Sequence, residues 1–249
     1  MTFSWFEFLV GYYFFLFLVL ECIYFHLFLK KYYLFKDSVV SISTGFISKY
    51  VLSITALATI PLSQYCWANR WVDIPKYLPY GWQWLDWLYS FFLLEISYYF
   101  LHRINHSVNF FWATHSVHHS SQYLNLFTGF RVGWTYFLTI NWLVYWCCLP
   151  TFGVHPEMIV GYLILIRKYQ FFIHSDYLPN LHWLQVFLNT PGLHRIHHSA
   201  DINHHNKNFG GISIIFDRIF GTYEPEKRKV HYTFGLGRDF STSCFATPI

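Results

Sequence analysis

Long apolar runs separated by short polar segments make up most of the first two thirds of the chain. A helix needs about 20 mainly apolar residues to cross the hydrocarbon core of a bilayer. Five stretches approach that length, at residues 6–29, 39–62, 81–101, 132–149 and 157–173. The pattern predicts an all-α fold, a multi-pass membrane helix bundle with about four to five spanning or re-entrant helices.

Two shorter segments differ from these runs. Residues 109–119 are too short to span a bilayer, and they predict a cytoplasmic helix. Residues 208–223 are aromatic and aliphatic, with Asp217 and Arg218 inserted, which is typical of an interfacial amphipathic segment. We therefore divide the chain into N-terminal membrane helices (1–80), a catalytic domain (81–223) and a C-terminal tail (224–249).

The composition supports a membrane protein. Charged residues make up only 12% of the chain and aromatic residues 24%, so a soluble fold of this size could not bury all its aromatic side chains. The net charge of +4 is modest and the basic residues are scattered, which argues against nucleic acid as a partner.

Basic residues also predict the orientation, because they collect on the cytoplasmic side of membrane helices. None precedes the first apolar run, whereas Lys30, Lys31 and Lys36 follow it. This distribution places the first loop inside the cell. The third and fifth runs then end on the same cytoplasmic side, at His102 and His174.

Eight of the 15 histidines form three short clusters, two of which share the spacing His-x-x-His-His. On a helix, residues three and four apart lie on one face. Eight imidazoles exceed the roughly four donors of a single tetrahedral zinc ion, so we predict a dimetal site in a cytoplasmic helical cap. His174 ends an apolar run on the same side and is a ninth candidate. The clusters are His102 and His106; His115, His118 and His119; and His194, His197 and His198.

Imidazole binds zinc, copper, iron and nickel, and the spacing alone does not separate iron from zinc. A membrane setting favours oxygen chemistry on a lipid C–H bond, and zinc has no redox chemistry. Polar side chains that accept from the second ring nitrogen usually support such ligands. The candidates for this role are Glu95, Asn125, Asp176, Asp201 and Asn208.

These residues stand in motifs that resemble those of the fatty acid hydroxylase superfamily, also labelled sterol desaturase. The motifs are HRINH at 102–106, HSVHHSSQYLNL at 115–126, NTPGLHRIHH at 189–198, NFGG at 208–211 and DRIFGTYEPE at 217–226. The HHSS and NTP segments most resemble the branch that contains alkylglycerol monooxygenase. The resemblance implies a non-haem centre of two iron ions held by the eight clustered histidines and His174. It also implies insertion of oxygen from dioxygen into a C–H bond of a fatty acyl, sterol or ether lipid.

Several positions depart from the branch. Gln122 and Leu124 replace an acidic residue and a tyrosine, and Asn206 and Glu95 stand where the family pattern has aspartate. These departures leave the histidines intact but bear on substrate and reductant, so the reductant stays open, tetrahydropterin being one option. We expect electrons from a separate donor, because the chain has no room for a fused cytochrome b5 or flavin domain.

Three other functions compete with hydroxylation. A desaturase would use the same centre. A zinc-dependent membrane hydrolase would need a catalytic carboxylate beside its ligands, as in H-E-x-x-H, but Arg, Ile and Asn separate His102 from His106. A haem electron carrier needs only two facing histidines. The sequence therefore favours an oxygen-dependent lipid hydroxylase whose substrate enters from the bilayer.

Overall fold

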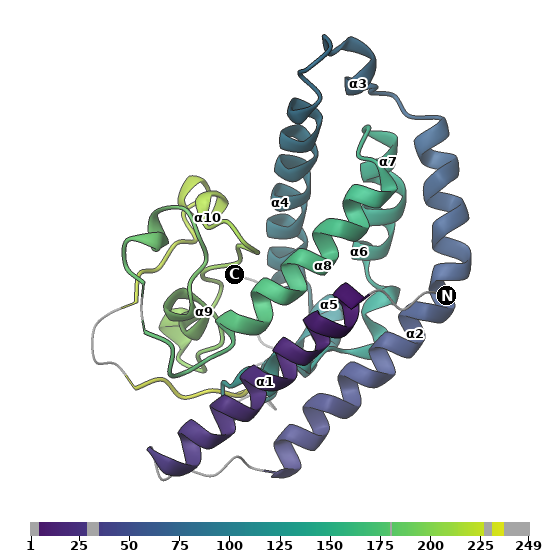
Figure 1. Ribbon diagram of the computed structural model, residues 1–249. Helices are drawn as coiled ribbons and strands as arrows, with labels where there is room; N and C mark the ends of the chain where they lie inside the picture. Colours follow the sequence, from purple (N-terminus) through teal and green to yellow (C-terminus); the bar gives the residue numbers. More distant parts are fainter. Residues whose placement is uncertain (1–4, 29–34, 180, 227–230, 237–249) are drawn as a thin grey trace.

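The computed structural model describes residues 5–28, 35–179, 181–226 and 231–236. Within these ranges the chain is helical, and the only β pairing consists of two isolated bridges, which confirms the all-α prediction for this part of the chain. Four long helices, α1, α2, α4 and α8, carry the fold; α9 and α10 lie in a lobe at one side, and α3 lies at the upper end (Figure 1). The α-helices are α1 (Trp5–Leu27), α2 (Phe35–Ala68), α3 (Ile74–Tyr77), α4 (Trp84–Ser107), α5 (Asn109–His119), α6 (Ile140–Leu143), α7 (Leu149–Thr151), α8 (Pro156–Ile173), α9 (Pro191–His197) and α10 (Ile215–Ile219).

Helix α2 is the one helix of the described residues that is long and apolar enough to cross a membrane. Only 11% of its most apolar window is buried inside the protein. A core helix of a soluble protein would be mostly buried, so the exposed apolar surface of α2 is typical of contact with lipid. Helices α1, α4 and α8 coincide with three further predicted runs.

The prediction of one helix over residues 132–149 is wrong. The segment consists of a 3-10 turn η2 (Trp134–Leu138), α6, a π-helical turn η3 (Val144–Cys148) and α7. Polar side chains explain the break, because Thr139 and Asn141 are buried and bond locally. The Asn141 amide donates to Thr139 and to Asn105 of α4. The hydrogen bond to Asn105 holds the segment against α4.

The segment at 208–223, for which an interfacial amphipathic segment was predicted, is buried in part. Phe209 is fully buried and Phe216 is 6% exposed, and both rings pack against Tyr99 of α4. The inserted Asp217 is buried as well, and its carboxylate accepts hydrogen bonds from the backbone N–H groups of Phe209 and Gly210, each at 2.7 Å. Phe209, Phe216 and Asp217 therefore belong to the core, whereas Ile215, Ile219 and Phe220 of the same segment are exposed apolar side chains.

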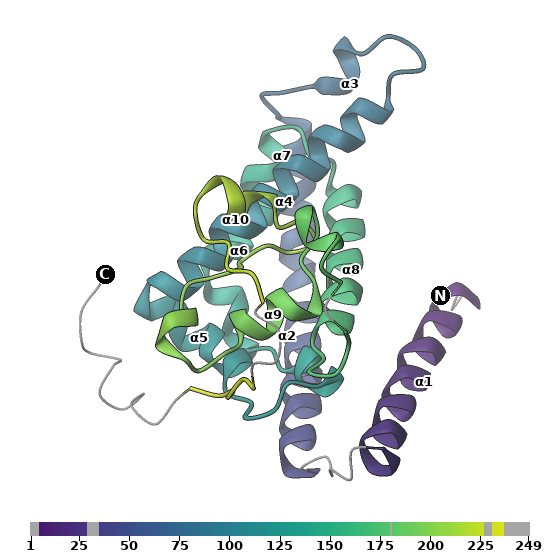
Figure 2. The same cartoon turned by 90° about the vertical axis from the view of Figure 1, so that its left-hand side faces the viewer.

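Residues 174–226 form a compact lobe beside α4 and the C-terminal end of α8 (Figures 1 and 2). The lobe holds α9 and α10, and α5 lies next to it (Figure 2). The elements that carry the histidine clusters therefore meet at one end of the long helices. Lys30, Lys31 and residues 227–229, on which the predicted orientation partly depends, lie outside the described residues.

Candidate metal centre

Four elements bring the nine histidines together. His102 and His106 lie in the last turns of α4, and the cluster at 115–119 ends α5. Val108, between the two helices, has an extended backbone (φ −107°, ψ 116°), which breaks the helix and lets α5 fold back against α4. The third cluster lies on α9 with His198 as its C-cap, and His174 is the C-cap of α8.

The side chains sort into two groups that could each hold a metal ion. The first group, here called the five-histidine group, contains His102, His106, His115, His119 and His197. The four-histidine group contains His118, His174, His194 and His198. Within each group the candidate ligand atoms lie within 4.8 Å of one another. Among the described residues, neither group includes a carboxylate or a thiolate.

The two His-x-x-His-His clusters interlock between these groups. His115 and His119, four residues apart, join the five-histidine group, whereas His118 between them turns to the other group. The third cluster does the reverse, because His194 and His198 join the four-histidine group and His197 crosses over. Each of the two helices therefore contributes histidines to both groups. The spacing predicted that all three histidines of a cluster lie on one helix face, and it did not predict this division.

The ring nitrogens are arranged as metal ligands would be. The Nε2 atoms of His102 and His115 are 3.1 Å apart, and Nε2 of His174 lies 3.1 Å from that of His118 and 3.0 Å from that of His194. Two nitrogens bound at about 2.1 Å to one ion at a right angle are separated by about 3 Å. In the described part of the chain, four further buried ring nitrogens have no hydrogen-bond partner, the Nε2 atoms of His106, His119, His197 and His198. Such atoms fit a metal ion.

Backbone carbonyls hold the other face of several rings. The Nδ1–H groups of His102 and His118 donate to the carbonyls of Phe209 and Arg131, both at 2.8 Å, and that of His197 donates to Lys207 at 2.9 Å. His174 donates in the same way to Gln170. A proton fixed on Nδ1 leaves the Nε2 lone pair for a metal.

Burial also keeps these imidazoles neutral. Desolvation lowers the pKa of His118 to about 4, and it lowers the pKa values of His119, His194 and His198 well below the ordinary value. Neighbouring imidazoles add to the lowering of the pKa at His119, His194 and His198, and the Arg131 guanidinium does so at His118, because a second positive charge nearby would repel the first. The uncharged form is the one that binds a metal, so the rings are ready as ligands at neutral pH.

Two of the residues predicted to accept a hydrogen bond from an imidazole, Glu95 and Asn208, bond to other partners. Glu95 is buried and accepts from the Tyr162 hydroxyl and from Ser213 N–H. Asn208 donates to the carbonyls of Leu193 and Glu224, which ties the loop before α10 to α9. These hydrogen bonds brace the segments that carry the histidines, and none of them reaches an imidazole.

The other three candidates lie farther along the loops. Asn125 caps the 3-10 turn η1 (Leu126–Phe130) through Thr128. Asp201 caps the turn η5 (Ile202–His204) at the surface, and the backbone N–H of Asp176 donates to Leu124. The sequence predicted side-chain acceptors for the imidazole N–H groups, but in the structure backbone carbonyls accept these hydrogen bonds. No sequence signal marks them, because every residue has one.

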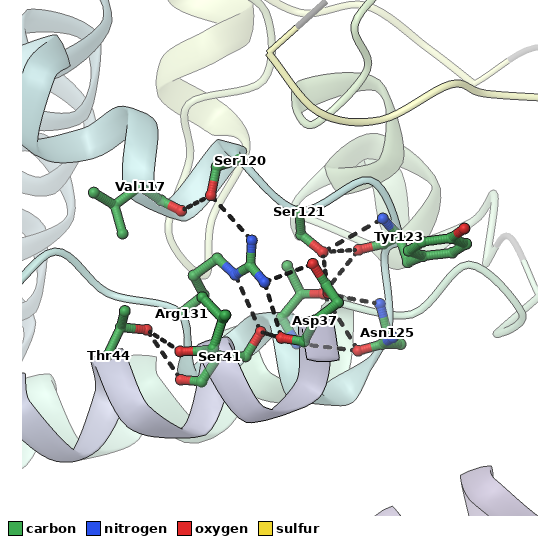
Figure 3. A network of polar contacts seen from close by, with 11 residues as sticks. Asp37, Ser41, Thr44, Val117, Ser120, Ser121, Tyr123, Asn125 and Arg131 are labelled. Atoms are coloured by element: carbon green, nitrogen blue, oxygen red, sulfur yellow. Dashed lines mark hydrogen bonds and ion pairs between the residues drawn. The ribbon is translucent and has the colours of Figure 1, made fainter. Parts of the chain in front are cut away.

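A buried ion pair positions one of these carbonyls (Figure 3). The guanidinium of Arg131 donates to Asp37 Oδ1 at 2.6 Å and to the hydroxyls of Ser41 and Ser120. Asp37 in turn accepts from Ser121 at 2.7 Å. Both serines of the HHSS motif therefore bond to this pair, which joins the start of α2 to the end of α5.

The centre opens onto an apolar cavity of about 730 Å³. His115, His118 and His174 form part of its wall. One face of α2 and one face of α8 form the long sides, with Phe46 and Phe171 among the lining residues. The size and the apolar lining fit the hydrocarbon chain of a lipid, and this hydrocarbon chain would lie directly against the histidines.

Residues 87–222 match the model of the fatty acid hydroxylase family. The chain belongs to this family. The match contains all nine histidines, so the two groups described above lie within the family's own domain.

Characterised relatives point in the same direction. The chain is 36% identical to alkylglycerol monooxygenase of Xenopus tropicalis over 238 residues, which is 92% of this chain and 50% of the relative. It is 38% identical to the human enzyme of the same name, over 83% of this chain and 44% of the relative. For the Danio rerio enzyme the identity is 34%, over 79% of this chain and 42% of the relative. The chain thus spans about half the length of these relatives. No solved structure matched it.

Proposed function

We propose that the chain is a membrane-bound, non-haem di-iron oxygenase that hydroxylates a lipid C–H bond with dioxygen. The observation that supports this function is the pair of all-histidine groups in the wall of an apolar cavity. The relatives named alkylglycerol monooxygenase support an ether lipid as the substrate, and the match to the fatty acid hydroxylase family supports a fatty acyl chain as the alternative.

The nine histidines are the proposed ligands, and the two groups would hold one iron ion each. Bound there, the iron would supply the activation of dioxygen and the oxidation of the C–H bond. The absence of a thiolate or a carboxylate from both groups, among the described residues, argues against a structural zinc site and a hydrolase of the H-E-x-x-H type.

The protein's own part is ligation, positioning and exclusion of water. The carbonyls of Phe209, Arg131 and Lys207 hold three rings in place, and no side-chain nucleophile or general base is needed. The apolar walls of the cavity would keep the hydrocarbon chain of the substrate out of water and against the histidines.

We also propose the membrane arrangement predicted from the sequence, with a correction. Helices α1, α2, α4 and α8 would lie in the bilayer as spanning or re-entrant helices, and the lobe at 174–226 would be the cytoplasmic cap. The division into membrane helices (1–80), catalytic domain (81–223) and tail (224–249) is part of this proposal. Electrons would come from a separate donor protein or a small reductant.

Metal analysis and lipid analysis test the proposal together. Protein purified after iron-replete expression should contain about two iron ions per chain. Cells that express it under isotopically labelled dioxygen should contain a lipid with a labelled hydroxyl group, or the aldehyde formed when a hydroxylated ether breaks down. The His118→Ala variant should form neither. A new double bond without label would show a desaturase instead, and zinc alone with no oxygen-dependent product would overturn the proposal.

A further inference from the structure

Three cationic side chains line the largely apolar cavity, and one of them, Lys168, directly follows Arg167 on α8. Lys49 lies on the lining face of α2 and Arg167 on the lining face of α8. The lining residues of α8 are spaced as one continuous helical face that ends at His174. Arg167 precedes His174 by seven residues, or about 10 Å along the helix axis. The charge is therefore close to the histidines but not among them.

The packing places Lys49 and Arg167 at the same level of the cavity. Helices α2 and α8 run in opposite directions, since Trp67 meets His155 at one end and Gly45 approaches Phe130 near the other. Phe130 also packs on Phe171, with ring centroids 5.4 Å apart. Lys49 follows Gly45 by one turn and Arg167 precedes Phe171 by one turn. Both cations thus lie one turn from the layer of Phe130, on the side away from the histidines.

Neither Lys49 nor Arg167 has an anionic partner among the described residues. The ion pairs there join Arg70 to Asp73, Arg131 to Asp37, and Arg195 to Glu226. A positive charge inside a membrane-embedded region is costly, and in membrane proteins such a charge usually marks the path of a substrate or an ion. Two of them facing one apolar cavity would bind an anion attached to an apolar chain.

We propose that the cavity selects a lipid with a single hydrocarbon chain and an anionic phosphate or carboxylate headgroup, held between Lys49 and Arg167. The Arg167 guanidinium suits two oxygens of one such group, and Lys49 adds a second charge. The hydrocarbon chain of the lipid would then extend along α8 toward His174. This inference rests on the proposed function for the identity of the cavity as the substrate site.

Equilibrium binding tests the inference without turnover. The full-length, metal-loaded protein in nanodiscs of neutral phosphatidylcholine is kept free of oxygen. Radiolabelled hexadecylglycerol phosphate and hexadecylglycerol, which differ only in the charged group, are then titrated. A charge-assisted contact contributes about 1.5–3 kcal/mol, so the phosphate should bind at least about tenfold more tightly. Lys49→Gln and Arg167→Gln should each reduce that preference, and the double variant should abolish it.

Lys36→Gln is the matched control, because Lys36 lies on α2 outside the cavity lining. It should leave the preference unchanged. Unchanged binding of neutral hexadecylglycerol shows that the double variant is folded. Inorganic phosphate should not displace the labelled lipid; displacement at equal concentration would indicate a site for the free anion and overturn the inference. Equal affinity for both lipids in the unmodified protein would also overturn it. Because no oxygen is present, these outcomes are independent of whether the enzyme hydroxylates.

Discussion

His118 and Arg131 are joined through the backbone: the Nδ1–H of the imidazole donates to the Arg131 carbonyl at 2.8 Å. The guanidinium of the same arginine is 2.6 Å from Asp37 at the start of α2. One residue therefore orients a candidate ligand with its backbone and anchors itself to a membrane-spanning candidate helix with its side chain (Figure 3). A substitution that breaks the ion pair should therefore also disturb the position of His118 in the candidate metal centre.

We expect Arg131→Met to destabilise the fold and to lower the metal content. The variant leaves the largely buried Asp37 carboxylate without its cation, which costs about 3 kcal/mol in comparable buried pairs. Thermal unfolding and the iron-to-protein ratio measure the two effects. Arg70→Met, which breaks the more exposed pair with Asp73, should change stability by less than about 1 kcal/mol and leave the iron content intact. Equal behaviour of the two variants would contradict this role of Arg131.

The interlocked clusters predict different results for two adjacent histidines. His118→Ala leaves three histidines in the four-histidine group and should lower metal content by about one ion. His119→Ala leaves four in the five-histidine group, which is enough for one ion, so metal content should stay near that of the unmodified protein. Elemental analysis of both purified variants decides the matter. The same loss in both would show that the two groups do not act as separate sites.

Acid should destabilise the metal-free protein through these histidines. The pKa of His118 is lowered to about 4, whereas an unfolded histidine titrates near 6.5. A lowered pKa in the folded state gives stability that is complete above pH 6.5 and is lost as the pH falls toward 4, by up to about 1.4 kcal/mol per pH unit for each such group. The unfolding temperature should therefore fall between pH 7 and pH 5. His118→Ala should flatten that slope, and an unchanged slope would refute the assignment.

The sequence predicted the long helices better than the segments between them, and the nine histidines that it singled out lie together in the structure. α5 begins and ends where the pattern of residues 109–119 placed it, because its length and polarity are local properties. The break in the helix over residues 132–149 and the burial of Asp217 were not predicted, since burial of Asn141 and Asp217 depends on partners in α4 and in the loop at 209–210. A sequence does not reveal such long-range partners. The sorting of the histidines into two groups likewise depends on how α5 and α9 face each other.

Tyr145 combines an unusual backbone with an unpaired polar atom. It lies in the π-helical turn η3, a conformation that often occurs at functional sites. The residue is 4% exposed and lines the cavity, and its hydroxyl has no hydrogen-bond partner among the described residues. A buried hydroxyl without a partner costs about 1–3 kcal/mol unless a ligand or water supplies one. We therefore expect it to bond an oxygen of the lipid.

Tyr145→Phe should leave the protein as stable as before, or more stable by about 1 kcal/mol, because it removes an unsatisfied polar atom. It should weaken the binding of hexadecylglycerol several-fold, since the lipid oxygen loses its donor. The same change at Tyr162, whose hydroxyl donates to the buried Glu95, should instead destabilise the fold. Thermal unfolding without lipid, followed by lipid titration, separates these effects. A destabilised Tyr145→Phe variant with unchanged lipid affinity would show that the hydroxyl serves the fold alone.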